Sequence, residues 1–332
     1  MEYVQLGRTG VQVSPICLGT MNFGDRTPEE ESIRILDRAI EAGINFVDTA
    51  NYYGQVLNDG AGMGHTEERL GRYFAATGHR NWVVLASKFL FPTDWDDPNA
   101  RGGSRRHVIR ACEESLRRLQ TEWIDLYQMH APDPRGVPID ETLRALDDLV
   151  RSGKVRYIGT SHFAAWQIVE ALWVSKELCL NRFVSEQEKC SLVRRRIEAE
   201  LLPMARKHDI AILAYQSLGA GLFSGKYKMD ADLPGDSRYA DPAWSGYKDS
   251  YLTEEGLAVQ DVLSELAEEK GRTTSQLATS WVLTRSGVTS VILGPRTVDQ
   301  LEDSLGALDV EWTEEDLARI DEVAPGPNQQ PR

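Results

Sequence analysis

The stretch WVVLASK, residues 82–88, is a run of apolar residues that ends in a lysine. Two further runs, AILAY at 211–215 and SVILG at 290–294, are equally continuous. Strands that are buried on both faces have this pattern, because helices cover both sides of a parallel sheet. These runs therefore predict an α/β fold built on a parallel sheet.

Short apolar runs alternate with longer amphipathic segments along the chain. The predicted sheet strands are Ile16–Leu18, Asn45–Asp48, Trp82–Lys88, Ile124–Gln128, Val155–Thr160, Phe183–Gln187, Ile210–Tyr215 and Ser290–Leu293. A hairpin of Tyr3–Leu6 and Val11–Ser14 is predicted to precede them. Eight strand–helix units without a break in composition favour one closed (β/α)8 TIM barrel over residues 1–324, with long loops at its carboxyl rim and a polar tail at 325–332.

The segments between the strands have the periodicity of helices. The predicted helices are Glu29–Ala42, Glu67–Ala76, Ser104–Leu119, Ile139–Ser152, Ala164–Leu180, Ile197–His208, Leu257–Lys270, Ser275–Arg285 and Thr297–Leu305. Thr27, Pro28 and Glu30 predict a capping box at the start of the first of these helices. Gly71 and Gly153 stand where helices are expected to end.

An open dinucleotide-binding sheet is the alternative architecture, and its motif is missing from the sequence. The first predicted sheet strand is followed by GTMNFG at 19–24, which lacks the G-x-G-x-x-G pattern. The segment GAGLFSGKY at 219–227 also resembles a nucleotide-binding loop but does not match the Walker A pattern. Ala220 and Tyr227 stand where a Walker A loop needs a glycine and a serine or threonine. Neither nucleotide motif is present.

Composition excludes several classes of protein. The 332 residues include 51 acidic and 37 basic side chains, giving a formal net charge of −14. A nucleic-acid-binding protein needs a basic stripe, which this chain lacks. Four scattered cysteines have neither zinc-ligand nor disulfide spacing, so no metal site is predicted and a cytoplasmic location is expected. No signal peptide and no apolar run near the ~18 residues of a membrane span is found, so no membrane partner is expected.

Polar residues terminate several of the predicted strands. In barrels of this type, active sites lie at the carboxyl ends of the strands. Asp48 ends the second strand and Lys88 the third, His130 follows the fourth, and Tyr53 lies just beyond Asp48. A nearby ammonium lowers the pKa of a phenol, and a carboxylate holds the ammonium in place. With an imidazole to orient a carbonyl group, this set suits protonation of an oxygen as hydride arrives at carbon. Singly, each residue also has a structural interpretation, such as a loop cap or a turn.

The chain resembles the aldo-keto reductases over nearly its whole length. The matching segments are LGTMNFG (18–24), NFVDTANYYG (45–54), GHTEERLG (64–71), LASKF (85–89), IDLYQMHAPD (124–133), GKVRYIGTS (153–161), VSEQ (184–187), AYQSLGAGLFSGKY (214–227) and VILGPRTVDQLEDS (291–304). The resemblance implies reduction of an aldehyde or ketone. It selects Tyr53, rather than its neighbour Tyr52, as the proton donor and implies Asp48, Lys88 and His130 as its catalytic partners.

The resemblance also implies NADPH/NADP+ as the cofactor. The implied contacts are Gly19, Thr20 and Met21 beside the nicotinamide, and Ser161 and Gln187 on its carboxamide. Tyr215, Gln216, Ser217, Leu218, Gly219, Gly221 and Leu222 are implied along the pyrophosphate, and Gly294, Arg296, Gln300 and Asp303 near the adenosine 2′-phosphate and adenine. Asp48, His162 and Lys226 are further implied cofactor contacts. An arginine at a helix N-terminus is physically suited to a phosphate. Two residues depart from the family pattern: His162 replaces an asparagine, and Cys190 replaces the aromatic residue that stacks on nicotinamide.

The substrate is expected to be a small carbonyl compound. Candidate pocket residues are Phe23, Tyr53, Phe89, Trp95 and His130. Tyr239, Trp244, Tyr247 and Tyr251 lie in one long loop, where they either stack on substrate or fix the loop to the barrel rim. The loop at 55–64 is expected beside Tyr53. The resemblance leaves open a general carbonyl reductase, a reductase of keto-deoxysugars, and a cofactor-binding regulatory subunit similar to potassium-channel β subunits.

Overall fold

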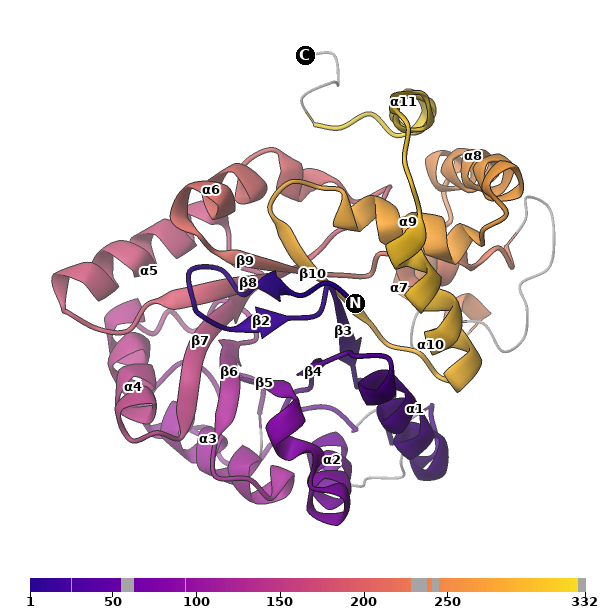
Figure 1. Cartoon of the computed structure of the whole chain (residues 1–332). Coiled ribbons are helices and arrows are strands. Elements are labelled where there is room, and N and C mark those ends of the chain that lie inside the picture. Colours follow the sequence, from indigo (N-terminus) through magenta and orange to yellow (C-terminus); the bar gives the residue numbers. More distant parts are fainter. Residues whose placement is uncertain (25, 55–62, 93, 228–237, 241–244, 328–332) are drawn as a thin grey trace.

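The computed structural model describes residues 1–24, 26–54, 63–92, 94–227, 238–240 and 245–327. Eight parallel strands of these residues close into a barrel in the order β10-β3-β4-β5-β6-β7-β8-β9 (Figure 1). They are β3 (Ile16–Gly19), β4 (Phe46–Asp48), β5 (Val84–Phe89), β6 (Ile124–Met129), β7 (Val155–Ser161), β8 (Phe183–Lys189), β9 (Ala211–Tyr215) and β10 (Val288–Leu293). The predicted (β/α)8 barrel is confirmed, and each strand overlaps its prediction.

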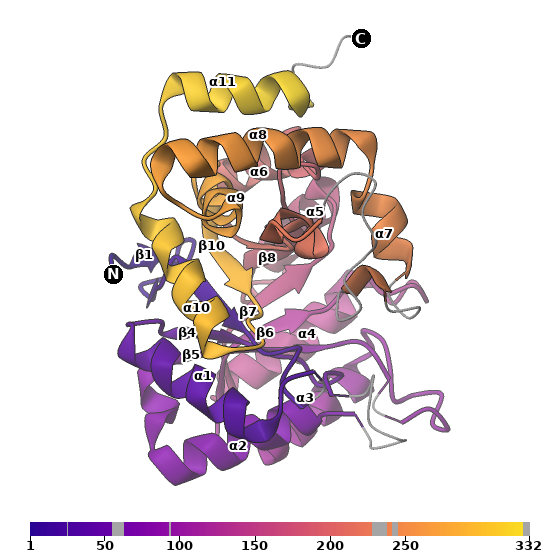
Figure 2. The same ribbon diagram turned by 90° about the vertical axis from the view of Figure 1, so that its right-hand side faces the viewer.

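Helices surround the barrel (Figure 1). Those that match predicted segments are α1 (Glu29–Glu41), α2 (His65–Thr77), α3 (Arg105–Leu119), α4 (Ile139–Arg151), α5 (Ala165–Glu177), α6 (Leu201–His208), α8 (Glu254–Lys270), α9 (Thr274–Leu283) and α10 (Val298–Leu305). The sequence does not predict α7 (Ser245–Tyr251) or α11 (Glu314–Val323). Figure 2 shows α11 lying along α8, where Lys270 and Asp316 form an ion pair of 2.7 Å. No helix within the described ranges is both long and apolar enough to cross a membrane.

The start of α1 differs from the predicted capping box. Pro28 is the N-cap residue, and its carbonyl accepts a hydrogen bond of 2.9 Å from Ser32 N. A turn in which Gly24 N donates to Thr27 O keeps Thr27 outside the helix. Thr27 Oγ1 is buried and has no hydrogen-bond partner in the described part of the chain. The predicted cap is therefore wrong.

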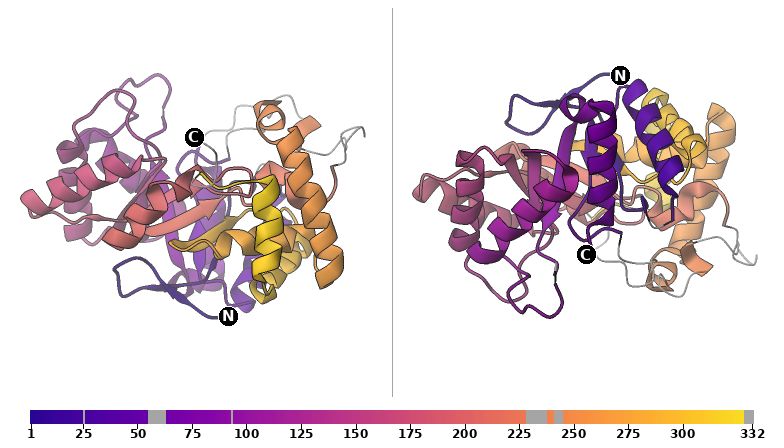
Figure 3. Two further views of the ribbon diagram at one scale, coloured as in Figure 1. Left: turned by 90° about the horizontal axis from the view of Figure 1, so that it is seen from above. Right: turned by 90° about the horizontal axis from the view of Figure 1, so that it is seen from below.

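The N-terminal hairpin closes one end of the barrel. It consists of β1 (Val4–Gln5) and β2 (Gln12–Val13), which pair antiparallel as predicted. Leu6 and Val13 are fully buried in a cluster with interior residues at the amino ends of the strands, including Phe46 and Ala211. Figure 3 shows the hairpin and the long loop after β5 on opposite sides of the molecule. The carboxyl ends of the strands are therefore left free for polar groups.

Interior side chains change from apolar to polar along the strands. Residues two apart on a strand face the same side of a sheet. Phe46 and Ala86 belong to the apolar interior cluster. One step further along β4 and β5, Asp48 and Lys88 occupy the next interior layer. The same step on β6 leads to Gln128, so the barrel places a ring of polar groups above its apolar base.

Gly71 lies inside α2 and does not end it, contrary to the prediction. The helix continues to Thr77 and is ended by Gly78 in a left-handed conformation. A Cβ on Gly71 would lie 2.1 Å from the carbonyl oxygen of Arg118 in α3. The glycine is therefore needed for the close approach of two helices. Gly153 follows α4 with a φ of +77°, as a helix-ending glycine should.

Some predicted features fall outside the described residues. These are residues 55–62 of the loop beside Tyr53, the side chain of Trp244, and residues 328–332 of the polar tail.

We predict that Gly71→Ala destabilises the protein by at least ~2 kcal/mol, because the new methyl group meets backbone that a side-chain rotation cannot move. Chemical denaturation of the variant measures the loss. Gly246→Ala is the matched control, since Gly246 is also helical and a Cβ there meets nothing within 4 Å. Equal stability of the two variants would contradict the packing role of Gly71.

Candidate functional site

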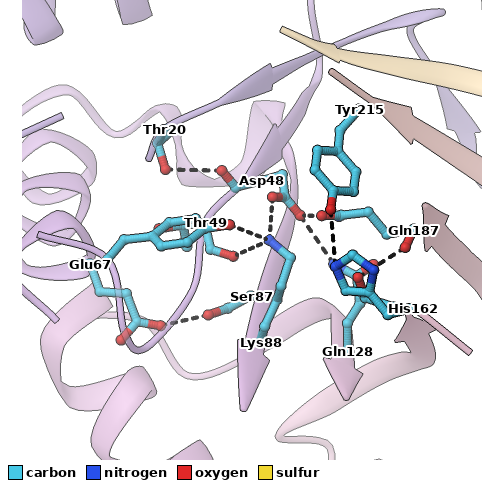
Figure 4. A network of polar contacts seen from close by, with 12 residues as sticks. Thr20, Asp48, Thr49, Glu67, Ser87, Lys88, Gln128, His162, Gln187 and Tyr215 are labelled. Carbon is cyan, nitrogen blue, oxygen red and sulfur yellow. Dashed lines mark hydrogen bonds and ion pairs between the residues drawn. The ribbon is translucent and has the colours of Figure 1, made fainter. Parts of the chain in front are cut away.

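Polar side chains from successive strands meet at the carboxyl end of the barrel. Figure 4 shows Asp48 on β4, Lys88 on β5, Gln128 on β6, Gln187 on β8 and Tyr215 on β9. His130 directly follows β6, and its N–H donates to Phe89 O at 2.9 Å, so β5 and β6 end together. The structure thus brings Asp48, Lys88 and His130 to one place, as strand-end reasoning predicts.

Lys88 and Asp48 form a buried ion pair at the centre of this group. The exposed fractions of the two residues are 0% and 2%. Lys88 Nζ contacts Asp48 Oδ1, donates to Thr49 O at 3.0 Å and lies 3.3 Å from Tyr53 Oη. All three hydrogens of the ammonium therefore have an oxygen to meet, which a buried cation requires.

The second carboxylate oxygen of Asp48 accepts two further hydrogen bonds. Gln128 Nε2 donates to Asp48 Oδ2 at 3.1 Å, and Gln187 Nε2 donates to the same atom at 2.9 Å. Thr20 N and Oγ1 both donate to the Asp48 carbonyl, at 3.0 and 2.9 Å. The carboxylate is thereby fixed from three strands, and the backbone of Asp48 is fixed from the loop after β3.

Gln128 is a site residue that the sequence reasoning missed. It ends the predicted strand Ile124–Gln128 but was not selected with the other strand-end residues, and in the structure β6 continues to Met129. The available signal was its position two residues after Leu126, which faces the barrel interior.

The pKa values of the Lys88–Tyr53 pair follow from burial and charge. Burial lowers the pKa of Lys88, but the charges of Asp48 and Tyr53 outweigh it, so the net shift is upward and the ammonium form is favoured. Burial raises the pKa of Tyr53, and Lys88 offsets only part of that rise. The expected lowering of the phenol pKa by Lys88 is therefore present, but it is smaller than the effect of burial. The outcome favours a protonated phenol beside a cation.

His130 completes the group. Its ring lies edge-on to that of Tyr53, with 5.9 Å between centroids, and its Nδ1 is buried without a hydrogen-bond partner in the described chain. Burial, followed by the charge of Lys88, holds the pKa of His130 well below its usual value. A neutral imidazole therefore faces the phenol.

Two of the predicted pocket residues lie elsewhere. Phe89 alternates with Lys88 and faces outward, where its ring packs 5.0 Å from that of Tyr127. Phe23 is also buried in the outer core, with 1% of its surface exposed. Neither side chain lines the barrel mouth. Phe91, which the sequence analysis did not select, has its ring centroid 4.8 Å from that of His130 and is 37% exposed.

Other predicted residues lie nearer the rim. Trp95 is 58% exposed, and the Arg101 guanidinium lies 5.6 Å from its ring centroid. Met21 is 37% exposed and follows Gly19 and Thr20 at the end of β3.

The residues expected near a nicotinamide carboxamide are joined to each other. Ser161 Oγ donates to Gln187 O at 2.9 Å. His162 has a left-handed φ of +61° and contacts Tyr215 Oη through Nε2 at 3.0 Å. Its Nδ1 lies 3.3 Å from Glu188 Oε1. Cys190 is fully buried, so its side chain offers no surface to a ligand.

The stretch Tyr215–Leu222 is held from the long loop that follows it. Tyr239 Oη donates to Gly219 O at 2.6 Å, and Tyr251 Oη donates to Gln216 Oε1 at 2.7 Å. Both tyrosines are buried, which supports the interpretation that these two rings fix the loop. Within the stretch, Ser217, Gly219 and Leu222 are buried and Leu218 and Gly221 are half-buried, and Lys226 Nζ lies 5.3 Å from the Tyr227 ring centroid.

The start of α10 has the predicted phosphate-binding residues. Thr297 Oγ1 accepts from Gln300 N at 3.3 Å, and Gln300 Oε1 accepts from Arg296 N at 2.8 Å. Gly294 is exposed beside them. Asp303 lies on the same helix, where it accepts hydrogen bonds from Thr273 and Gln276 of the neighbouring α9 segment.

Comparison with known proteins identifies relatives of the whole chain. Residues 15–325 match the Aldo/keto reductase family. The chain is 41% identical to the uncharacterized oxidoreductase YrpG of Bacillus subtilis (strain 168) over 333 residues, which cover 98% of this chain and 97% of that protein. It is 32% identical to probable voltage-gated potassium channel subunits beta of Arabidopsis thaliana and Oryza sativa subsp. japonica, over 93% of this chain and 92% of each.

We predict that folded His130 takes up no proton near the ordinary histidine pKa, because burial and Lys88 disfavour the imidazolium. NMR of the ring carbons, with His130→Asn to assign the signal, measures this. In urea the same signal should titrate near the ordinary histidine pKa of ~6.5. A folded-state midpoint near that value would contradict the site described here.

Proposed function

The chain belongs to the aldo/keto reductase family, and from that premise we propose that it reduces an aldehyde or ketone to an alcohol with NADPH, using Tyr53 as proton donor. Family membership makes it an oxidoreductase that uses a nicotinamide cofactor. The observation that carries the finer proposal is the 3.3 Å distance between Tyr53 Oη and Lys88 Nζ, inside a site where Lys88 is paired with Asp48.

Tyr53 acts as the general acid. Its raised pKa keeps the phenol protonated at neutral pH, so the proton is available when a carbonyl oxygen arrives. The cofactor, when bound, supplies hydride to the carbonyl carbon. The proton passes from Tyr53 Oη to the carbonyl oxygen, and the alcohol is formed. Lys88 then stabilises the phenolate that remains, because the two charges lie within hydrogen-bond distance.

His130 orients the substrate. A neutral imidazole donates one hydrogen bond without competing for the proton that Tyr53 delivers, and an orienting donor is most effective where water is excluded. The depressed pKa of His130 maintains that neutral form. Phe91 and Tyr53 lie against the His130 ring and hold it in place.

The residues at the start of α10 fit the 2′-phosphate of NADPH. The Arg296 guanidinium makes no hydrogen bond and no ion pair within the described residues. It stands before the eight-residue helix α10, whose N-terminus favours an anion and already holds one, since Val298 N donates to Glu31 Oε1 at 2.9 Å. In a protein with a net charge of −14, such a local cation is needed to receive a phosphate. These features support NADPH over NADH.

The potassium-channel relatives support a second function, in which the chain binds cofactor and acts through a protein partner. The two functions differ in turnover. A regulatory subunit of this kind would bind NADPH yet oxidise it slowly with every carbonyl compound in a panel, whereas a reductase would show at least one good substrate.

We predict that Tyr53→Phe abolishes NADPH oxidation with a generic aldehyde and leaves NADPH affinity nearly intact, because only the transferable proton is removed. Absorbance of NADPH measures turnover, and fluorescence titration measures binding. Tyr52→Phe is the matched control and should retain turnover. Full activity of Tyr53→Phe would exclude the proposed proton donor.

We predict that Arg296→Ala raises the Michaelis constant for NADPH by about tenfold or more and changes that for NADH by less than about twofold, because only NADPH carries the phosphate. Steady-state kinetics with both cofactors provides the comparison. Arg156→Ala removes an exposed charge at the start of β7 and serves as the control. Equal effects of Arg296→Ala on both cofactors would place the 2′-phosphate elsewhere.

A further inference from the structure

Glu67 is a fully buried carboxylate that the mechanism above does not use. It lies in the first turn of α2 and is 0% exposed. Ser87 Oγ donates to Glu67 Oε1 at 2.6 Å, and Arg118 Nε of α3 donates to Glu67 Oε2 at 2.8 Å. We call Glu67, Ser87 and Arg118 the Glu67 clamp. Replacing a buried ion pair with apolar side chains is often neutral or stabilising, so stability alone is a weak reason for a carboxylate here.

One arm of the Glu67 clamp leads to Lys88. Ser87 and Lys88 are neighbours on β5, and successive side chains of a strand point to opposite faces. Ser87 therefore points outward to α2 while Lys88 points into the barrel. Figure 4 shows Glu67 and Ser87 beside Lys88. Because the bond to Glu67 fixes Ser87 against α2, it also fixes the segment of β5 from which Lys88 extends.

The other arm leads to Tyr53. The Tyr53 carbonyl accepts hydrogen bonds from Gly64 N at 3.2 Å and Thr66 N at 3.4 Å, at the start of α2. Gly64 has a φ of +91°, and a Cβ there would lie 2.4 Å from Arg118 Nε. Arg118, held by Glu67, therefore packs directly against the turn that holds the backbone of Tyr53.

We propose that the Glu67 clamp is a positioning device that sets the distance between Tyr53 Oη and Lys88 Nζ. Glu67 joins α2, β5 and α3 through two directional contacts, and the two residues that it positions are those whose side chains meet at 3.3 Å. Glu67 is fully buried, and its hydrogen bonds go to Ser87 and Arg118 rather than to the group around Tyr53. The inference rests on the proposed function only for its effect on turnover, since the effect on the geometry of Tyr53 is independent of the reaction.

The test compares two clamp variants with a matched control. Glu67→Gln removes the charge that pairs with Arg118, and Ser87→Ala removes only the bond that leads to β5. Asp125→Asn is the control, because Asp125 also accepts hydrogen bonds from an arginine, Arg80, at 2.8 Å and from the β5 backbone at Leu85 N at 2.9 Å. It does so at the amino end of the strand, away from Tyr53.

Three kinds of measurement are made on each variant: its thermal stability, its steady-state kinetics (kcat and the Michaelis constants for NADPH and an aldehyde), and the titration midpoint of Tyr53. Tyrosine labelled with 13C at Cζ reports that midpoint by NMR, and Tyr53→Phe assigns the signal. We expect both clamp variants to lower kcat by about tenfold or more, because a misplaced acid loses its alignment, while the Michaelis constant for NADPH changes by less than about threefold. Both should shift the Tyr53 midpoint, and Asp125→Asn should shift neither kcat nor the midpoint.

Clamp variants whose kcat and Tyr53 midpoint match those of Asp125→Asn would overturn the proposal and leave Glu67 a purely structural residue. If Glu67→Gln does not fold, Ser87→Ala decides, because it leaves the pair of Glu67 and Arg118 in place. Failure of the proposed function has a different signature: Tyr53→Phe would remain active, while the NMR midpoints would still test the clamp.

Discussion

The ion pair between Lys88 and Asp48 is the interaction on which the rest of the site depends. Removing two charges from water costs several kcal/mol per ion, and their attraction repays this only when the remaining hydrogen-bonding atoms are satisfied. The surrounding structure meets this demand: Gln128 and Gln187 donate to Asp48, and the Thr49 carbonyl accepts from Lys88. These contacts come from several strands, so only a closed barrel brings them together. The Tyr53 phenol then meets an ammonium whose position is already fixed.

The two ends of the barrel differ in the side chains that fill them: apolar residues at the amino end and polar residues at the carboxyl end. At the amino end, Leu6 and Val13 of the hairpin complete an apolar interior with Phe46. At the other end, the same strands carry the polar ring that includes Asp48 and Lys88. The net charge of the chain is −14, yet the cations to which we propose a function are local: Lys88 inside the barrel and Arg296 before α10. The overall charge therefore disfavours a nucleic-acid partner without indicating which ligand the protein binds.

The sequence predicted the features that follow from the pattern of apolar and polar residues. It did not predict which face of a strand a given side chain occupies. The barrel strands were predictable because continuous apolar runs are typical of strands buried on both sides, and Lys88 was conspicuous because it ends such a run. Gln128 was missed although it ends its predicted strand, because the sequence does not show that its side chain faces Asp48 in the barrel interior. Phe89 was chosen in place of Phe91 for the same reason: Phe89 faces the outer core, and Phe91 reaches His130. Gly71 was wrongly predicted to end a helix, because the backbone that it packs against, at Arg118, is distant in the sequence.

Asp48 and Lys88 act as one coupled unit, and a double-mutant cycle on folding stability tests this coupling most directly. Denaturation of the wild-type protein, Asp48→Asn, Lys88→Met and the double variant gives the coupling free energy. Either single change leaves a buried charge or donor unpaired, so each should cost about 3 kcal/mol or more. The double variant should recover at least ~2 kcal/mol of the summed losses. Losses that add to within ~0.5 kcal/mol would contradict the account.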